Sequence, residues 1–216
     1  MDCFSNLPEG VKILAVSKKQ SAERIRELWF QGQKCFGENY LQEALPKIAS
    51  LSDTDIQWHY IGKIQRNKTA QIAENFSWVH TIDNAIIARR LSAQRPEKLV
   101  PLQVCMQINF EFNEITSQRA GVKPEEALIL AQEILKLPQL QLRGLMMIAP
   151  IASATATFDE QCSFFRPLRE LLESLNKNLS VKLDTLSMGM SADYKAAIAE
   201  GATLVRLGTA IFGRRL

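Results

Sequence analysis

Short apolar runs alternate with amphipathic segments along the whole chain, and this alternation predicts the fold. Apolar runs rich in β-branched residues, bounded by turn residues, are typical of buried strands. The expected strands are Val11–Ser17, Lys34–Gly37, Ile56–Gly62, Trp78–Ile82, Leu102–Ile108, Leu142–Ile148, Thr185–Met188 and Leu204–Gly208. The segments between them have helical periodicity, and the expected helices are Ser21–Gln31, Tyr40–Ser50, Asn67–Asn75, Asn84–Gln94, Pro124–Leu137, Phe158–Asn176 and Ser191–Glu200.

Strands that are apolar throughout and separated by helices indicate a parallel sheet covered on both faces. About eight such units in 216 residues predict an α/β protein, a single (β/α)8 TIM barrel spanning residues 1–216 as one domain. An open doubly wound sheet is the alternative, but its first strand normally leads into a glycine-rich turn. Here the first strand runs into Ser17-Lys18-Lys19, which contains no glycine and favours the barrel.

Composition and charge limit the classes of partner and the cellular location that we expect for this chain. A hydrophobic content of 46% with 23% charged residues is ordinary for a water-soluble globular protein. A net charge of +3, with basic residues dispersed along the chain, gives no reason to expect nucleic acid or a membrane as partner. No signal peptide or membrane-spanning run is recognisable, so a cytoplasmic location is expected. The cysteines are far apart without a CxxC motif, which predicts no metal site and no disulfide: Cys3, Cys35, Cys105 and Cys162.

The last two expected strands end in residues suited to a phosphate group. One ends in Ser187-Met188-Gly189-Met190-Ser191 and the other in Arg206-Leu207-Gly208-Thr209. Glycines let the backbone approach a ligand, hydroxyls and backbone N–H groups donate hydrogen bonds, and the guanidinium supplies positive charge. Barrels often build a phosphate site after strands seven and eight. The chain is therefore expected to bind a phosphorylated small molecule.

Lys18 directly follows the first expected strand. Taken alone, it would be interpreted as a solvated lysine at a strand–helix junction. A closed barrel, however, pairs its first strand with its eighth, so Lys18 becomes a neighbour of Arg206-Leu207-Gly208-Thr209. An aldehyde that carries a phosphate would engage both groups. This combination points to pyridoxal 5′-phosphate held as a Schiff base on Lys18.

Several segments, spread in order over nearly the whole chain, closely resemble the family of pyridoxal phosphate homeostasis proteins (the YggS/PROSC type). The segments are ILAVSK at Ile13–Lys18, FGENYLQE at Phe36–Glu43, WHYIGKIQRNK at Trp58–Lys68, HTID at His80–Asp83, GLMMIAP at Gly144–Pro150, LSMGMSADYKAAI at Leu186–Ile198 and VRLGTAIFG at Val205–Gly213. The resemblance implies a fold like the barrel domain of alanine racemase, which is fold type III among pyridoxal phosphate proteins.

The resemblance also implies a set of cofactor-binding residues. Lys18 matches the lysine that carries the cofactor, and Asn39 matches a polar residue near its ring. The full implied set is Lys18, Asn39, Ser187, Met188, Ser191, Arg206, Gly208 and Thr209. Members of the family are regarded as cofactor carriers involved in vitamin B6 homeostasis and amino- and keto-acid balance, without an established reaction. A monomer is implied, with pyridoxal-phosphate-dependent apo-enzymes or regulatory proteins as candidate partners.

A pyridoxal-phosphate-dependent amino-acid racemase is the alternative function. Racemisation needs a proton donor on each face of the substrate, and Lys18 could serve one face. In two-domain alanine racemases the opposite tyrosine comes from a second, β-rich domain of the partner subunit. This chain stops at Arg214-Arg215-Leu216, just after the last expected strand. We therefore expect no enzymatic activity, and Lys18 as the catalytic residue if there is one.

The sequence departs from the family pattern in two places. Only about ten residues precede the first strand, where relatives carry a longer helix, so a cap over the bottom of the barrel is expected to be shortened or missing. The loop after the fifth strand, residues 109–121, lacks the Ser-Gly turn and the lysine that relatives often have. His59 and His80 are expected to be core or hydrogen-bonding histidines, because their separation matches no metal-binding motif.

Overall fold

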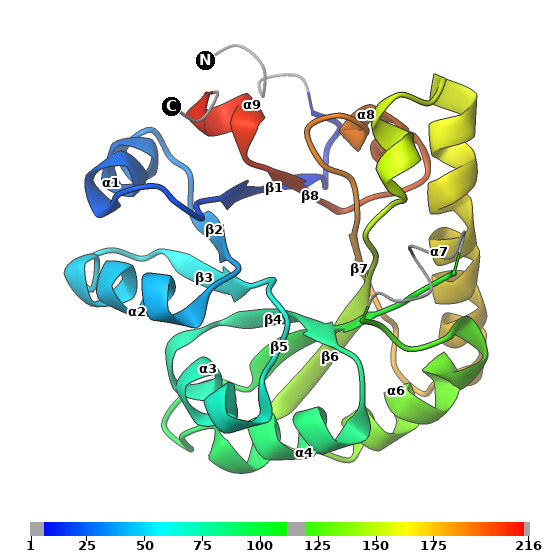
Figure 1. The fold of residues 1–216 in the computed structure, drawn as a ribbon. Coiled ribbons are helices and arrows are strands. Elements are labelled where there is room, and N and C mark those ends of the chain that lie inside the picture. The colour runs from blue at the N-terminus through cyan, green and yellow to red at the C-terminus, as the bar shows by residue number, and fades with distance from the viewer. Residues whose placement is uncertain (1–6, 112–119, 214–216) are drawn as a thin grey trace.

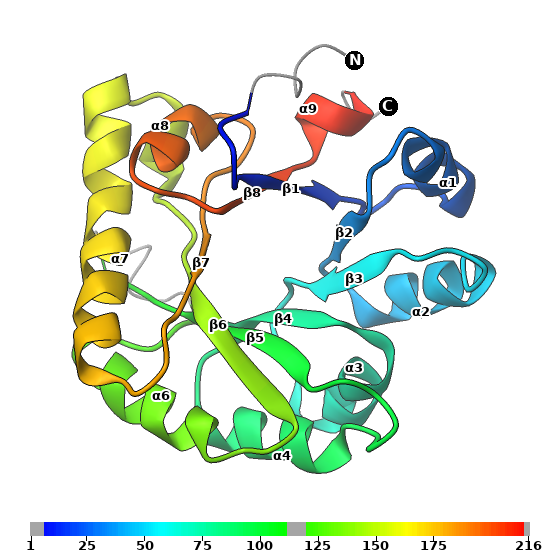
Figure 2. The same ribbon diagram turned by 180° about the vertical axis from the view of Figure 1, so that it is seen from behind.

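Eight parallel strands form a closed barrel in the computed structural model, which describes residues 7–111 and 120–213. Figures 1 and 2 show the strands as a ring, with the helices outside it. The strands are β1 Lys12–Val16, β2 Cys35–Glu38, β3 Gln57–Tyr60, β4 Trp78–Ile82, β5 Leu102–Gln107, β6 Leu140–Met146, β7 Thr185–Ser187 and β8 Leu204–Leu207. The barrel predicted from the alternating pattern is confirmed.

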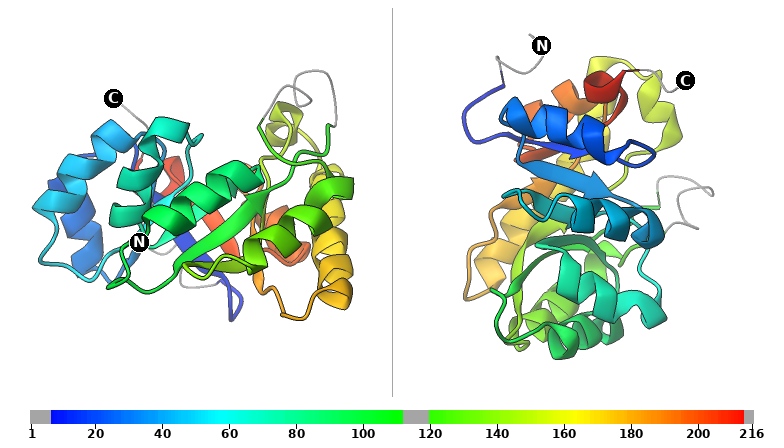
Figure 3. Two further views of the ribbon diagram at one scale, coloured as in Figure 1. Left: turned by 90° about the horizontal axis from the view of Figure 1, so that it is seen from below. Right: turned by 90° about the vertical axis from the view of Figure 1, so that its left-hand side faces the viewer.

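Helices follow the strands and cover the barrel from outside, as Figure 3 shows from two further sides. The α-helices are α1 Ala22–Phe30, α2 Leu41–Ser50, α3 Thr69–Asn75, α4 Ala85–Gln94, α6 Ala127–Leu135, α7 Phe158–Asn178, α8 Tyr194–Ala199 and α9 Thr209–Phe212. Short 3₁₀ helices are η1 Arg66–Lys68, η2 Pro124–Glu126 and η3 Ile151–Ala154. In the described ranges no helix has the length and apolar character needed to cross a membrane.

Local sequence chemistry explains where several helices begin. The Ser21 and Asn84 side chains accept hydrogen bonds from the backbone of the first turns of α1 and α4. Thr157 and Glu160 form a reciprocal capping box at the start of α7. Such caps satisfy N–H groups that have no partner within the helix.

The barrel closes because β1 pairs in parallel with β8. Ala15 lies opposite Leu207 in this pairing, so the residues that follow each strand emerge side by side. Most of the apolar core lies between the barrel and the helices. A smaller cluster inside the barrel contains Trp78, Cys105 and Met146. Buried polar side chains, among them His59, His80 and Arg206, share the interior with further apolar residues such as Leu14.

Several sequence-based boundaries were wrong. β6 spans Leu140–Met146 instead of Leu142–Ile148. α8 begins at Tyr194, which leaves Ser191 in the loop after β7. The short elements η3 and α9 were not predicted, because neither is long enough to develop a periodic pattern.

Candidate functional site

A cavity of about 390 Å³ lies at the carboxyl end of the barrel, which is where barrel enzymes and binding proteins place their sites. Its volume falls within the usual range for small-molecule sites. It brings together these residues of the expected set: Lys18, Asn39, Ser191, Arg206, Gly208 and Thr209. Apolar side chains complete its wall: Val16, Ile61, Met146, Ile148 and Met190.

Lys18 reaches this cavity from the end of β1, and its side chain is half-buried. The next residue, Lys19, is exposed and has a positive φ of 62°. Non-glycine residues seldom adopt this left-handed conformation. The backbone N–H of Lys19 donates a hydrogen bond to the Glu43 carboxylate on α2. The two adjacent lysines therefore have different surroundings, one in the cavity wall and the other in solvent.

A buried ionic network anchors the end of β1 just before Lys18. The Ser17 hydroxyl donates to Glu38 Oε1 at 2.6 Å. Lys47 Nζ donates to the same carboxylate oxygen and to the Ser17 carbonyl, both at 2.8 Å. Burial raises the pKa of Glu38, against the opposing effects of Lys47 and Ser17. The network joins β1, β2 and α2, and so fixes the strand end from which Lys18 projects.

Sequence reasoning did not assign this network a role. A glutamate at the end of an expected apolar strand, FGE, was the available signal, because a charged side chain is rarely buried without a partner. The partner, Lys47, lies on the following helix and could not be identified without the register of the fold.

Arg206 lies almost fully buried on β8, with 6% of its surface exposed. Its Nη1 donates to the Ser187 carbonyl at 2.6 Å and to the Ser187 hydroxyl at 3.0 Å. Its Nη2 donates to the Met147 carbonyl at 2.7 Å. Burial lowers the pKa of Arg206 to about 10, so the guanidinium keeps its charge at neutral pH. The cavity therefore has a fixed cation at its floor.

Backbone donors surround the same space. The N–H group of Thr209, the first residue of α9 and part of the cavity wall, has no hydrogen-bond acceptor in the described part of the chain. The same is true of the N–H groups of Ser191 and Ala192 in the loop after β7. Unpaired backbone donors at one concave site are suited to an oxyanion.

Asn39 contributes an unusual feature. Its Oδ1 is buried and has no hydrogen-bond partner within residues 7–111 and 120–213. A buried polar atom without a partner is costly, so its presence in a cavity wall indicates a site for a ligand donor group.

The structure brings only part of the expected set to the cavity wall. Ser187 and Met188 are fully buried and do not line the cavity. Ser187 contacts Arg206, whereas Met188 packs in the core between the barrel and the helices. Gly189 then turns with φ +87°, and a Cβ there would lie 2.6 Å from the Ala197 side chain. This turn directs the following residues, Met190 and Ser191, toward the cavity.

Two buried histidines occupy the barrel interior beneath the cavity, in line with the expectation of hydrogen-bonding core histidines. His59 Nδ1 lies 2.9 Å from His80 Nε2, and His80 Nδ1 lies 2.8 Å from the Ser187 hydroxyl. Burial lowers the pKa of both imidazoles, that of His59 to about 3, so both are neutral. Across the described residues, no group of three or more metal-binding side chains is found.

Some of the sequence-based expectations concern segments that the structure does not describe. Residues 1–6, residues 112–119 of the loop after β5, and Arg214-Arg215-Leu216 lie outside the described residues. Neither the shortened N-terminal cap nor the altered loop is tested, and both stay predictions.

The barrel and its cavity first define a class of protein. The family model described as alanine racemase, N-terminal domain matches residues 4–215. Solved alanine racemases share the fold at low sequence identity. The enzyme from Corynebacterium glutamicum superimposes with a TM-score of 0.69 at 17% identity, over 96% of this chain and 57% of that one.

Closer relatives define the particular protein family. The chain is 51% identical to the pyridoxal phosphate homeostasis protein of Pseudomonas aeruginosa over 208 residues, 96% of this chain and 86% of the relative. PipY of Synechococcus elongatus, solved with pyridoxal phosphate bound, superimposes with a TM-score of 0.86 at 38% identity, over 97% of this chain and 95% of that one. The chain belongs to the pyridoxal phosphate homeostasis protein family, as its motifs predicted.

Proposed function

We propose that this protein binds pyridoxal 5′-phosphate in the cavity at the carboxyl end of the barrel and serves in the homeostasis of this cofactor. One observation carries the proposal: Lys18 and the donors of Gly208 and Thr209 line the same cavity from the adjacent strands β1 and β8. The names of the relatives support the same ligand.

The residues present fit this cofactor. When bound, pyridoxal phosphate supplies an electrophilic aldehyde carbon, which condenses with a primary amine and releases water. Lys18 is the proposed attachment residue. The backbone and hydroxyl donors of Ser191 and Thr209 would hold the phosphate, and the Arg206 guanidinium would add positive charge. Asn39, with its unpaired Oδ1, would accept a hydrogen bond from the ligand.

We propose a carrier instead of an enzyme. Of the cavity-lining residues that the structure describes, only Lys18 and Arg206 carry ionisable side chains. Arg206 is held by Ser187 and Met147, and its pKa of about 10 keeps it protonated. A racemase needs two groups that exchange protons on opposite faces of the substrate, and this wall offers one. The proposed role as a cytoplasmic monomer that passes the cofactor to apo-enzymes agrees with this chemistry.

The phosphate assignment has a direct test. Removing the Thr209 hydroxyl in Thr209→Val should weaken binding of pyridoxal phosphate by about 1.5–3 kcal/mol, the value of a hydrogen bond to a charged group. Thr209→Ser keeps the hydroxyl and should bind like the wild type. The affinity for pyridoxal, which lacks the phosphate, should be the same for all three proteins. An equal loss for both ligands would place the phosphate elsewhere.

The carrier assignment has a separate test. The cofactor-loaded protein is incubated with a panel of L-amino acids, while absorbance and chirality are followed together. We expect a spectral shift without formation of D-amino acid, because a second acid–base group is lacking. Steady D-amino-acid production that Lys18→Ala abolishes would establish a racemase instead.

A further inference from the structure

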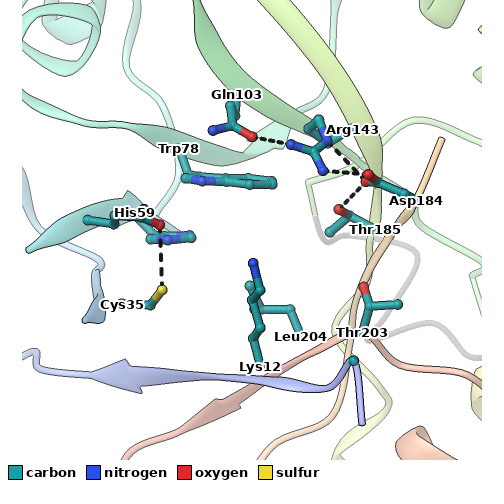
Figure 4. Close-up of a pocket in the computed structure, with 12 residues that line it drawn as sticks. Lys12, Cys35, His59, Trp78, Gln103, Arg143, Asp184, Thr185, Thr203 and Leu204 are labelled. Atoms are coloured by element: carbon teal, nitrogen blue, oxygen red, sulfur yellow. Dashed lines mark hydrogen bonds and ion pairs between the residues drawn. The ribbon is translucent and has the colours of Figure 1, made fainter. Parts of the chain in front are cut away.

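A second cavity lies at the opposite, amino-terminal end of the barrel and is not part of the proposed cofactor site. Its volume is about 320 Å³. Figure 4 shows Lys12, His59 and Thr203 directed toward it from β3 and from the region where β1 meets β8. Lys12 is the first residue of β1, whereas Lys18 follows the last, so the two lysines serve opposite ends of the barrel.

His59 lines this cavity and has one buried ring nitrogen without a partner among the described residues. Its side chain is 1% exposed, its Nδ1 is engaged by His80, and its Nε2 has no partner among the described residues. A buried imidazole nitrogen without a partner is a costly arrangement unless a ligand completes it.

The hydrogen-bond chain behind His59 fixes which of its nitrogens carries the proton. Arg206 donates to the Ser187 hydroxyl oxygen, so the hydroxyl hydrogen is available for His80 Nδ1. His80 Nε2 then carries a hydrogen and donates it to His59 Nδ1. If His80 Nδ1 carried the hydrogen instead, it would donate to the Ser187 oxygen, and the buried Ser187 hydroxyl hydrogen would have no acceptor among the described residues. His59 Nε2 therefore carries an N–H group that has no acceptor among the described residues.

Two further donors converge on the same space. Lys12 has no ion-pair partner among residues 7–111 and 120–213. The Thr203 hydroxyl oxygen accepts from the Leu186 N–H at 2.9 Å, and its own hydrogen has no acceptor in the described part of the chain.

The remaining charges at this cavity are already balanced. Arg143 forms a bidentate ion pair with Asp184 and also donates to Gln103. The described lining therefore has one net positive charge, from Lys12. The Trp78 ring is covered on both sides, by the stacked His59 ring at 5.2 Å and by the Arg143 guanidinium at 5.3 Å. Because the Trp78 ring has no free face, the site does not favour a ligand that stacks on it. Together with the single positive charge of Lys12, this suits a small, singly charged ligand.

We propose that this cavity is a binding site for a small carboxylate anion. One carboxylate oxygen would accept from the Lys12 ammonium, and the other from His59 Nε2–H, with the Thr203 hydroxyl as a third donor. The single unpaired positive charge of the described lining matches a monoanion more closely than a phosphate dianion. The site does not depend on the proposed function at the other end of the barrel.

The test uses the whole chain, with histidine labelled for nitrogen NMR, and acetate as the probe at constant ionic strength. The His59 spectrum should show a neutral ring protonated at Nε2, and acetate should shift this signal in a saturable manner. Lys12→Gln should weaken acetate binding at least about tenfold, the loss expected for a charge-assisted contact. Lys12→Arg should retain it.

The matched control is Lys123→Gln, which removes an exposed lysine near the other end of the barrel and should leave binding unchanged. Thr203→Val should weaken acetate binding, and Thr203→Ser should retain it. No saturable shift, a His59 ring protonated at Nδ1, or an unchanged affinity in Lys12→Gln would overturn the proposal. Tighter binding of inorganic phosphate, or an equal response to chloride, would contradict the carboxylate class. None of these readouts involves pyridoxal phosphate, so failure here is distinguishable from failure of the proposed function.

Discussion

At the scale of single residues, the described chain buries polar groups and arranges them as chains of partners. Glu38, Lys47 and Ser17 form one such group at the end of β1. His59, His80, Ser187 and Arg206 form another through the interior. Because low-dielectric surroundings make an unpaired polar atom costly, these partners restrict the positions that the strand ends can take.

The Glu38 network predicts a specific dependence of stability on pH. Burial raises the Glu38 pKa above its ordinary value of 4.5, so the folded chain binds this proton more tightly than the unfolded chain. The contribution of Glu38 to stability therefore falls as pH rises from about 4.5 through the raised pKa. Glu38→Gln removes this titration. Its stability relative to wild type should improve steadily over that range.

Denaturant unfolding at a series of pH values between 4.5 and neutrality measures this difference. Glu74→Gln, on the exposed face of α3, is the matched control for removal of a glutamate outside the network. A Glu38→Gln variant whose difference from wild type does not change with pH would show that folding leaves the pKa of Glu38 unchanged.

At the scale of elements, the strand ends that build the cavity depend on close backbone approaches. Gly62 follows β3, and a Cβ at this position would lie 1.9 Å from the Asn39 carbonyl oxygen. No side chain can be accommodated against a backbone atom at that distance. Gly208 follows β8 and differs, because a Cβ there would meet the Val16 carbonyl oxygen at 3.6 Å, an ordinary contact.

These two glycines predict different outcomes for the same substitution. Gly62→Ala should lower the free energy of unfolding by about 1–3 kcal/mol, the usual effect of a forced backbone shift. It should also weaken cofactor binding, since it displaces Asn39. Gly208→Ala should change stability by less than about 0.5 kcal/mol. Chemical denaturation measures the free energy of unfolding of both variants. Equal values for the two variants would contradict the close approach at Gly62.

At the scale of the whole molecule, much of the fold and part of the site could be predicted from the sequence. Alternating periodicity gave the barrel, and barrel closure placed Lys18 beside Gly208 and Thr209, because that step needs only the strand order. The absence of Met188 from the cavity wall and the pairing of Glu38 with Lys47 depend on side-chain direction and register. Those details follow from tertiary packing, which periodicity does not encode.

The central claim is that Lys18 carries the cofactor beside a phosphate-binding site formed by the end of β8 and the loop after β7. Borohydride reduction of protein loaded with pyridoxal phosphate, followed by peptide mapping, tests it most directly. The account predicts a reduced adduct on Lys18, which Lys18→Ala abolishes and Lys19→Ala, the exposed neighbour, leaves intact. An adduct on another lysine, or one that survives Lys18→Ala, would contradict it.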